Sequence, residues 1–266
     1  MIIVSGQPPA AGTQELLAGA GRHAPAIYQA MNASHELFAY PSRRELLFEI
    51  SLRSATVDAA RALNESGAAF ATFYYSACNE TYWSLTDDGG FELRPGQAPA
   101  EAIRNIFTDG EAYAFECATA MMIVFYKALV ETISSERFNA VFKHLYLWDW
   151  QNHPFFPLRN AYRVERGIPG DVRYFKNPAV NPQTPQWQGE NAVDLSDGLF
   201  YGHGVGIRTA DEIIAELNRY RRIGGTVSAF LMNHATRPDY LFLAGLAEGT
   251  RTEHIRITAG TSFYTF

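Results

Sequence analysis

A helix that is apolar on almost every side most constrains how this chain can fold. It begins near Glu116 or Cys117, runs to about Ile133, and consists mainly of aliphatic and aromatic residues. A helix on the surface of a globular protein carries a polar face, whereas one that is apolar all round is buried. We therefore expect this helix to lie at the centre of the fold, with the other elements packed around it.

Three other helices are predicted from their start and stop signals. The sequence Ser42-Arg43-Arg44-Glu45 has the capping-box pattern, is followed by apolar residues at helical spacing, and is ended by Gly67. A shorter helix is expected after Ser134-Ser135-Glu136. A second capping pattern at Thr209-Ala210-Asp211-Glu212 opens a final amphipathic helix that ends before Gly224-Gly225.

Strands are predicted mainly in the second half of the chain, at 69–75, 81–85, 144–150, 172–175, 192–195, 199–202 and 229–232. The strand 81–85 is expected to be the hairpin partner of 69–75, a turn is expected at 87–90, and Asp197-Gly198 joins 192–195 to 199–202. The proline-containing stretch 152–170 is predicted to be a long loop. One central helix and largely antiparallel strands indicate the α+β class.

Size and charge narrow the classes of function. A chain of 266 residues suits one large domain, and its 47% hydrophobic and 19% charged residues are ordinary for a globular protein. The net charge is −6 and no basic block stands out, so we expect no nucleic-acid partner. The longest apolar stretch, from Ala120 to Tyr126, is too short to span a membrane. With no basic leader at the start, we expect synthesis in the cytoplasm and free thiols at Cys78 and Cys117.

Cys117 lies at the expected start of the central helix. Unpaired N–H groups and the helix dipole stabilise a thiolate there, and the pKa of a thiol, ordinarily about 8.5, can fall by a unit or more. A buried cysteine is also a common small apolar residue of protein cores. Position alone favours the structural role over the nucleophile.

Three polar residues are further candidates for the same site. Glu116 precedes the cysteine and can raise its pKa by repulsion or take its proton. Adjacent residues of a helix point about 100° apart, so we expect Glu116 to be a solvated acid of the first turn. Glu190 stands at the expected start of a strand. His203 lies between Gly202 and Gly204, and a base, an orienting group and a structural histidine all fit this pattern.

No pattern in the sequence indicates a metal or a cofactor. The seven histidines form no two-histidine metal spacing, the two cysteines are not a CxxC pair, and an EF-hand loop is absent. The glycines around His203 lack both the dinucleotide-binding spacing and the lysine of a phosphate-binding loop. We therefore infer no metal and no cofactor, and a structural role for Cys78.

Six blocks of sequence, in the same order, resemble the protein-glutamine gamma-glutamyltransferases of Bacillus spore coats. The blocks are MIIVSG at 1–6, FATF at 70–73, YAFECATA at 113–120, YFKNP at 174–178, QWQGEN at 186–191 and HGVGI at 203–207. The likeness extends from Met1 to about Leu243. Six ordered blocks are far more specific than any single motif, and they shift the interpretation of Cys117 from core residue to nucleophile.

The resemblance implies an NlpC-type, papain-like core and protein cross-linking without calcium. Matched position by position, Cys117 is the nucleophile, Glu190 is the carboxylate paired with it, and Glu116 is a second glutamate that substitutes in part. His203 matches a histidine close to that centre. The aromatic residues that match the walls of an active-site tunnel are Phe70, Trp150 and Trp187.

The reaction implied is acyl transfer in two halves, through a thioester. Cys117 attacks the carboxamide of a protein glutamine, ammonia leaves, and a lysine amine then forms an isopeptide bond. The resemblance implies protein substrates with accessible glutamine and lysine, spore coat proteins among them, and we expect a monomeric enzyme. It also implies synthesis in the mother-cell cytoplasm, with deposition on the spore surface. We expect a single catalytic domain over 1–266, with a C-terminal extension at 244–266.

Two alternatives remain open from the sequence. A papain-like peptidase or a peptidoglycan amidohydrolase would use the same Cys117, with His203 as the main base. A structural coat protein would keep the fold without activity, although Glu116, Cys117, Glu190 and His203 are all present.

Overall fold

The computed structural model describes residues 1–9, 17–249, 256–259 and 262–265. The α-helices are α2 (Ala24–Ala33), α3 (Arg43–Glu65), α4 (Pro99–Thr108), α5 (Cys117–Thr132), α6 (Ser135–Val141), α7 (Ala210–Arg219) and α8 (Tyr240–Ala247). The 3-10 helices are η1 (Leu17–Gly19), η2 (Phe73–Tyr75), η3 (Gly110–Ala112) and η4 (Pro185–Trp187). The strands are β1 (Ile2–Val4), β2 (Phe38–Tyr40), β3 (Ala69–Phe70), β4 (Trp83–Leu85), β5 (Phe91–Leu93), β6 (Ala114–Phe115), β7 (Tyr146–Leu147), β8 (Leu158–Tyr162), β9 (Val172–Lys176), β10 (Gly189–Asp194), β11 (Leu199–Gly202), β12 (Gly206–Thr209), β13 (Phe230–Pro238), β14 (Arg256–Ala259) and β15 (Ser262–Thr265).

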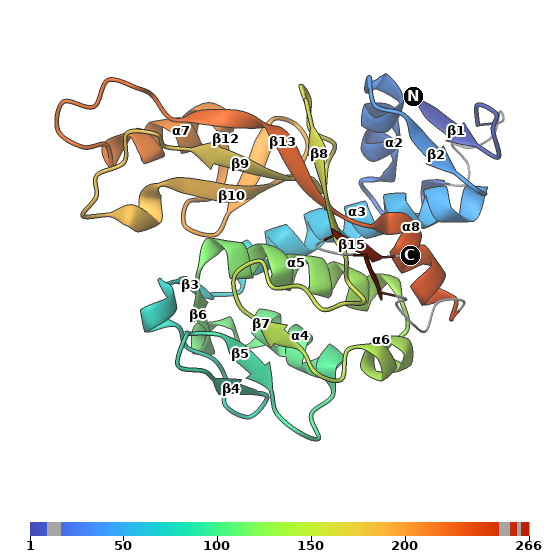
Figure 1. Cartoon of the computed structure of the whole chain (residues 1–266), viewed down its shortest axis with the longest axis horizontal. Helices are drawn as coiled ribbons and strands as arrows, with labels where there is room; N and C mark the ends of the chain where they lie inside the picture. The colour runs from blue at the N-terminus through green and yellow to red at the C-terminus, as the bar shows by residue number, and fades with distance from the viewer. Residues whose placement is uncertain (10–16, 250–255, 260–261, 266) are drawn as a thin grey trace.

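Helix α5 is the centre of the fold, as its apolar sequence predicts. Every residue from Cys117 to Tyr126 is buried, and the helix packs along α3. These two helices run between a six-stranded sheet and a smaller sheet of β4, β5 and β7 (Figure 1). The mixture of helices with antiparallel sheets confirms the predicted α+β class, including a central helix that carries the cysteine at its N-terminus.

The six-stranded sheet positions most of the residues predicted from the second half of the chain. Its strand order is β12-β11-β10-β9-β13-β8, and all neighbouring strands are antiparallel. Strand β10 lies inside this sheet and contacts both α5 and α3. The sheet therefore brings the segment around Glu190 to the central helix.

Element boundaries with a local chemical signal are predicted well. Ser42 caps α3 by accepting from the Arg44 N–H, and the helix ends one residue before Ser66-Gly67. Thr209 and Glu212 form the predicted capping box of α7. That helix is not the last, because α8 follows and places Leu246 fully buried in the main core.

Three predictions of local structure are wrong. The run 69–75 is a strand only at β3, after which η2 leaves Tyr74 87% and Tyr75 72% exposed. Strand β4 therefore pairs with β5 across the predicted turn at 87–90, and not with β3. The expected loop 152–170 contains β8, which is held by its register with β13 from far along the chain.

The region 244–266 includes the end of α8 and a hairpin of β14 and β15. Residues 250–255, 260–261 and 266 lie outside the described part of the chain. Among the helices that are described, none is both long and apolar enough to cross a membrane.

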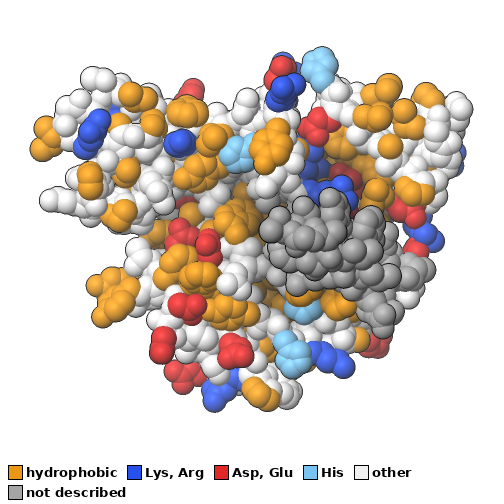
Figure 2. Space-filling model, viewed as in Figure 1, with side chains coloured by type: hydrophobic (Ala, Val, Ile, Leu, Met, Phe, Trp, Pro, Cys, Tyr) orange, Lys and Arg blue, Asp and Glu red, His pale blue; other side chains and the backbone are white. Residues whose placement is uncertain are grey.

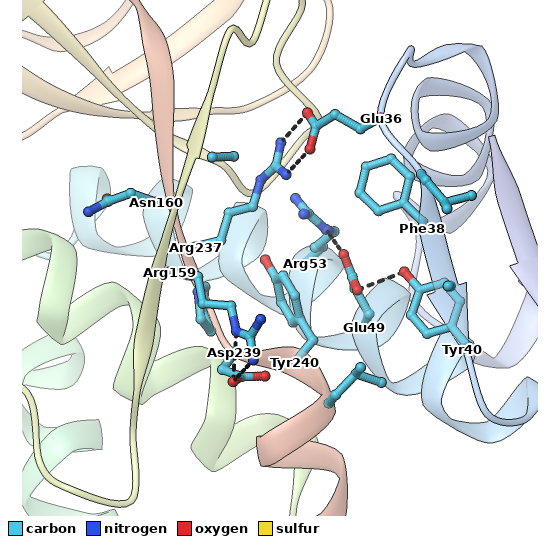
Figure 3. Close-up of a pocket in the computed structure, with 15 residues that line it drawn as sticks. Glu36, Phe38, Tyr40, Glu49, Arg53, Arg159, Asn160, Arg237, Asp239 and Tyr240 are labelled. Carbon is cyan, nitrogen blue, oxygen red and sulfur yellow. Dashed lines mark hydrogen bonds and ion pairs between the residues drawn. The ribbon is translucent and has the colours of Figure 1, made fainter. Parts of the chain in front are cut away.

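A buried ion network joins α3 to the sheet and to the N-terminal part of the chain. Asp171 is fully buried and accepts from Arg53 at 2.7 Å and from both Nε and Nη2 of Arg237 at 2.6 and 2.8 Å. Arg53 also donates to Glu49, and Arg237 donates to Glu36 (Figure 3). Burial alone would raise the pKa of Asp171, but Arg53 and Arg237 hold it at about 2.

Replacing Asp171 by alanine is expected to lower the free energy of unfolding by about 3–5 kcal/mol, because two buried guanidinium groups lose their shared partner. The native pKa of Asp171 lies below its usual 3.8, so the carboxylate stabilises the fold above about pH 4. That contribution disappears as the pH falls towards 2. Urea unfolding of Asp171→Ala and wild type at pH 7 and pH 3 measures both effects.

The matched control is Asp58→Ala, which removes a carboxylate from an exposed pair with Arg22. We expect a change of less than about 1 kcal/mol there. A comparably small effect of Asp171→Ala would contradict the structural role of the buried network.

Candidate active site

The backbone turn before α5 brings Glu116 onto the thiol of Cys117. Glu116 is the N-cap residue and has an extended backbone (φ −82°, ψ 159°), so the helical 100° offset does not apply to it. Its Oε2 accepts from the Ala118 N–H at 2.7 Å, and its Oε1 accepts from Cys117 Sγ at 3.0 Å. The expectation of a solvated acid that faces away from the thiol is therefore wrong.

Glu190 reaches the same centre from β10 and is only 2% exposed. Its Oε1 accepts from the Gly204 N–H at 3.2 Å, and a methyl group on Gly202 would come within 2.6 Å of that oxygen. Burial, together with the nearby Glu116, raises the pKa of Glu190 to about 8, although backbone N–H groups of Gly204 and His203 oppose this. Glu190 is therefore mostly protonated at neutral pH.

The Cys117 thiol is buried, with 5% of the residue exposed, and both carboxyl groups act on it electrostatically. Burial, then Glu190 and then Glu116 raise its pKa well above the ordinary range, whereas the Asn191 N–H lowers it. The expected decrease from the helix N-terminus is wrong for this resting state, because desolvation and two acidic neighbours outweigh the dipole. The Cys117 side chain is therefore a thiol at neutral pH, hydrogen-bonded to Glu116.

His203 has both ring nitrogens engaged away from the thiol. Nε2 lies 3.1 Å from the Ala69 carbonyl, which can only accept, so Nδ1 accepts from the Tyr201 hydroxyl at 2.9 Å. The ring stacks on Phe115 at 4.5 Å, and burial lowers its pKa to about 4. Of the three roles left open by the sequence, this geometry favours a neutral structural histidine that fixes β3 beside the site.

The three aromatic candidates do not form one contiguous cluster. Phe70 and Trp187 have ring centroids 6.2 Å apart, and the aromatic ring of Phe70 lies close to Gly204. Trp187 stacks on Tyr220, with ring centroids 4.1 Å apart. Trp150 packs against the main core beside Asp149, whose N–H donates to Thr119 in the first turn of α5.

Sequence reasoning missed two residues of the site, Asn191 and Tyr174. Asn191 Nδ2 lies 3.6 Å from Cys117 Sγ, so both its side chain and its backbone N–H face the sulfur. Tyr174 pairs with Asn191 across β9 and β10, and its pKa is raised by burial and by Cys117, Glu116 and Glu190. Both residues lie in the blocks 174–178 and 186–191, but their proximity depends on strand register, which has no local signal.

Acidic side chains also gather on the surface near the N-terminal end of α5 (Figure 2). Within the described residues, no group of three or more His, Cys, Asp or Glu side chains is arranged to hold a metal ion. A cavity of about 280 Å³ lies elsewhere, between α3, β2, β8, β13 and α8, and none of the candidate catalytic residues lines it (Figure 3).

This arrangement suits nucleophilic acyl transfer. A thiol bonded to a carboxylate can release its proton as it attacks a carbonyl carbon. A second carboxyl group whose pKa lies near 8 can both give and take a proton at neutral pH. Asn191 supplies hydrogen-bond donors for the negative charge that develops on sulfur.

Comparisons with known proteins point in one direction. A family model described as protein-glutamine gamma-glutamyltransferase matches residues 1–247. A protein of that name from Halalkalibacterium halodurans is 43% identical over 246 residues, which are 92% of this chain and 85% of the relative. One from Bacillus pumilus is 43% identical over 249 residues, which are 91% of this chain and 98% of the relative. The solved transglutaminase from Geobacillus stearothermophilus, without its C-terminal extension, superposes with a TM-score of 0.75 at 50% identity and covers 80% of this chain and 100% of that chain.

Proposed function

The chain belongs to the protein-glutamine gamma-glutamyltransferase family, and from this premise we propose that Cys117, Glu116 and Glu190 carry out its acyl transfer without calcium. The observation that supports this proposal best is the hydrogen bond from the Cys117 thiol to Glu116. The burial that raises the pKa of Glu190 to about 8 suits the second carboxyl group to proton transfer. The enzyme is a transglutaminase. Cys117, Glu116 and Glu190 each have a separate role in its two half-reactions.

The first half-reaction forms a thioester and releases ammonia. Cys117 Sγ attacks the carboxamide carbon of a substrate glutamine while its proton moves to Glu116. The oxyanion that forms is stabilised by N–H donors at the start of α5, a contribution of roughly 3 kcal/mol for one well-placed donor. The carbon–nitrogen bond then breaks as Glu190 gives its proton to the leaving nitrogen. One proton leaves sulfur and one reaches ammonia, so the step balances.

The second half-reaction returns both carboxyl groups to their resting state. A neutral lysine amine attacks the thioester carbon, and Glu190, now ionised, takes the proton that the nitrogen loses. The carbon–sulfur bond breaks, and the departing sulfur takes the proton held by Glu116. Phe70, Trp150 and Trp187 serve in this proposal as aromatic walls that suit a lysine stem and limit water.

Calcium independence is part of the proposal because neither half-reaction uses a metal. We expect a glutamine peptide and a fluorescent primary amine to be joined by the enzyme at the same rate with and without EDTA. The readout is fluorescence of the peptide product, separated by chromatography. A loss of activity with EDTA that calcium restores would contradict this part of the proposal.

The same assay separates transfer from the two alternative functions. A peptidase or amidohydrolase would release cleaved or deamidated peptide without incorporating the amine, and a structural protein would do neither. We propose protein substrates with accessible glutamine and lysine, and spore coat proteins as the natural set if the source organism forms spores. The support for that setting is the likeness to Bacillus relatives at 43% identity.

A further inference from the structure

The positive charge of this chain is carried almost entirely by arginine. The sequence contains 19 arginines and three lysines, at 127, 143 and 176. A guanidinium group stays protonated at any physiological pH, whereas a lysine amine can lose its proton and act as a nucleophile. An enzyme that transfers acyl groups to lysine therefore offers few acceptors on its own surface.

Lys127 is held within the fold. It lies on α5, its Nζ donates to Glu131 at 2.6 Å, and it sits 5.3 Å from the centre of the Phe107 ring. Only 18% of its side chain is exposed. The amine of Met1 is also engaged, because it donates to the carbonyls of Met31, Ser34 and Glu36.

Lys176 is exposed but belongs to a rigid strand. Its backbone is paired with Gly189 of β10 on one side and Phe230 of β13 on the other. Alternation along β9 places it on the same face as Tyr174, which lies beside Cys117. Lys176 therefore lies on the sheet face of its own active centre, in a strand that is paired on both sides.

Lys143, unlike Lys127 and Lys176, lies outside the helices and strands. It is exposed on the turn between α6 and β7, and it forms no ion pair within the described part of the chain. Surface turns are more mobile and more accessible to another protein than paired strands or packed helices. An acceptor must enter deeply here, because Cys117 is only 5% exposed.

We propose that Lys143 is the principal self-modification site of this enzyme, where a second copy attaches a glutamine-bearing chain. The inference rests on the proposed function. The Lys143 amine attacks the thioester carbon on Cys117 of the second copy, a carbon–nitrogen bond forms and the carbon–sulfur bond breaks. The nitrogen's proton goes to Glu190 and the sulfur takes the proton from Glu116 of that copy. With one dominant acceptor, the enzyme becomes a chain end in a cross-linked product, and not a branching point.

The test uses the full chain and an acetylated, biotinylated glutamine peptide without lysine as the acyl donor. The enzyme is incubated with the peptide alone, and the biotinylated residues are mapped by peptide mass spectrometry. We expect most of the biotin on Lys143 and its loss in Lys143→Arg. The matched variants Lys176→Arg and Lys127→Arg should keep it, since arginine preserves charge and removes only the acceptor.

A parallel reaction with cadaverine and the same peptide reports thioester turnover directly. Unchanged cadaverine incorporation by Lys143→Arg shows that the active site is intact in that variant. Biotin mainly on Lys176, Lys127 or Met1, or an unlabelled but cadaverine-active enzyme, would overturn the inference while leaving the proposed function standing. Failure of cadaverine incorporation in the wild type would instead remove the proposed function, and the inference with it.

Discussion

Cys117→Ala is expected to abolish amine incorporation, with a loss of at least about 10⁴-fold, because no other group described near the site can form the thioester. The fold should survive. The substitution removes one heavy atom from the start of α5, and the helix cap made by Glu116 to the Ala118 N–H does not involve the sulfur. Activity is measured as incorporation of a fluorescent amine into a glutamine peptide, and folding as urea unfolding.

Cys78→Ala is the matched control, since Cys78 is the other thiol of the chain. Its pKa is raised to about 11, first by burial and then by Glu80, so it stays a protonated thiol at neutral pH. We expect near-normal activity in this variant. More than trace incorporation by Cys117→Ala, or an inactive but folded Cys78→Ala, would place the nucleophile elsewhere.

Those parts of the fold that depend on neighbours in sequence could be predicted from the sequence. The apolar run after Cys117 indicates a central helix because no polar face is available to meet water. The caps at Ser42 and Thr209 place the starts of α3 and α7, since side-chain acceptors there satisfy free N–H groups. The end of α3 before Gly67 follows from the same local logic.

The predictions that were wrong concern segments whose structure depends on partners far along the chain. The aromatic run 69–75 has strand propensity throughout, yet only Ala69 and Phe70 find a partner strand, in β6. The chain then leaves the sheet and exposes Tyr74 and Tyr75. Strand β8 was missed for the converse reason, because its pairing with β13 offsets a sequence that contains little local strand signal.

In the candidate site, too, the features set by sequence neighbours could be predicted, whereas those set by tertiary contacts could not. Cys117 and Glu116 are adjacent, and the one error about their geometry came from treating the N-cap as helical. The contact of Asn191 with the sulfur requires β10 to lie against α5, and the proximity of Tyr174 requires the register between β9 and β10. The shift in the pKa of Glu190 likewise depends on burial by the tertiary fold, with Gly202 and Gly204 packed against it.

Replacing both Glu116 and Glu190 by glutamine is expected to reduce amine incorporation by about 10³-fold or more, because general acid–base transfer by positioned groups contributes roughly 10²–10⁴-fold. The single variants Glu190→Gln and Glu116→Gln should each impair a different step of the reaction. Glu190→Gln cannot protonate the leaving nitrogen, so single-turnover formation of the thioester should slow by about 10²-fold or more. Glu116→Gln removes both the acceptor of the thiol proton and a repulsive charge, so the pKa of Cys117 should fall.

The pH dependence distinguishes the roles of the two carboxyl groups. The pKa of Glu190 is raised from its usual 4.5 to about 8, so this group is protonated below pH 8 and loses its proton above it. Thioester formation by the wild type should therefore decline as the pH rises through about 8, since the acid for the leaving nitrogen is lost. Single-turnover ammonia release between about pH 6 and about pH 10 measures this decline, which should be absent from the slower Glu190→Gln enzyme.

Alkylation of Cys117 by iodoacetamide over the same pH range reports the thiol alone, because it needs no leaving-group acid. Glu116→Gln should be alkylated faster than wild type at neutral pH while it transfers amine more slowly, since its thiol ionises more easily but has lost its base. If Glu190→Gln kept the wild-type decline near pH 8, another group would be the acid. If Glu116→Gln left both alkylation and transfer unchanged, the hydrogen bond from the thiol would have no part in catalysis.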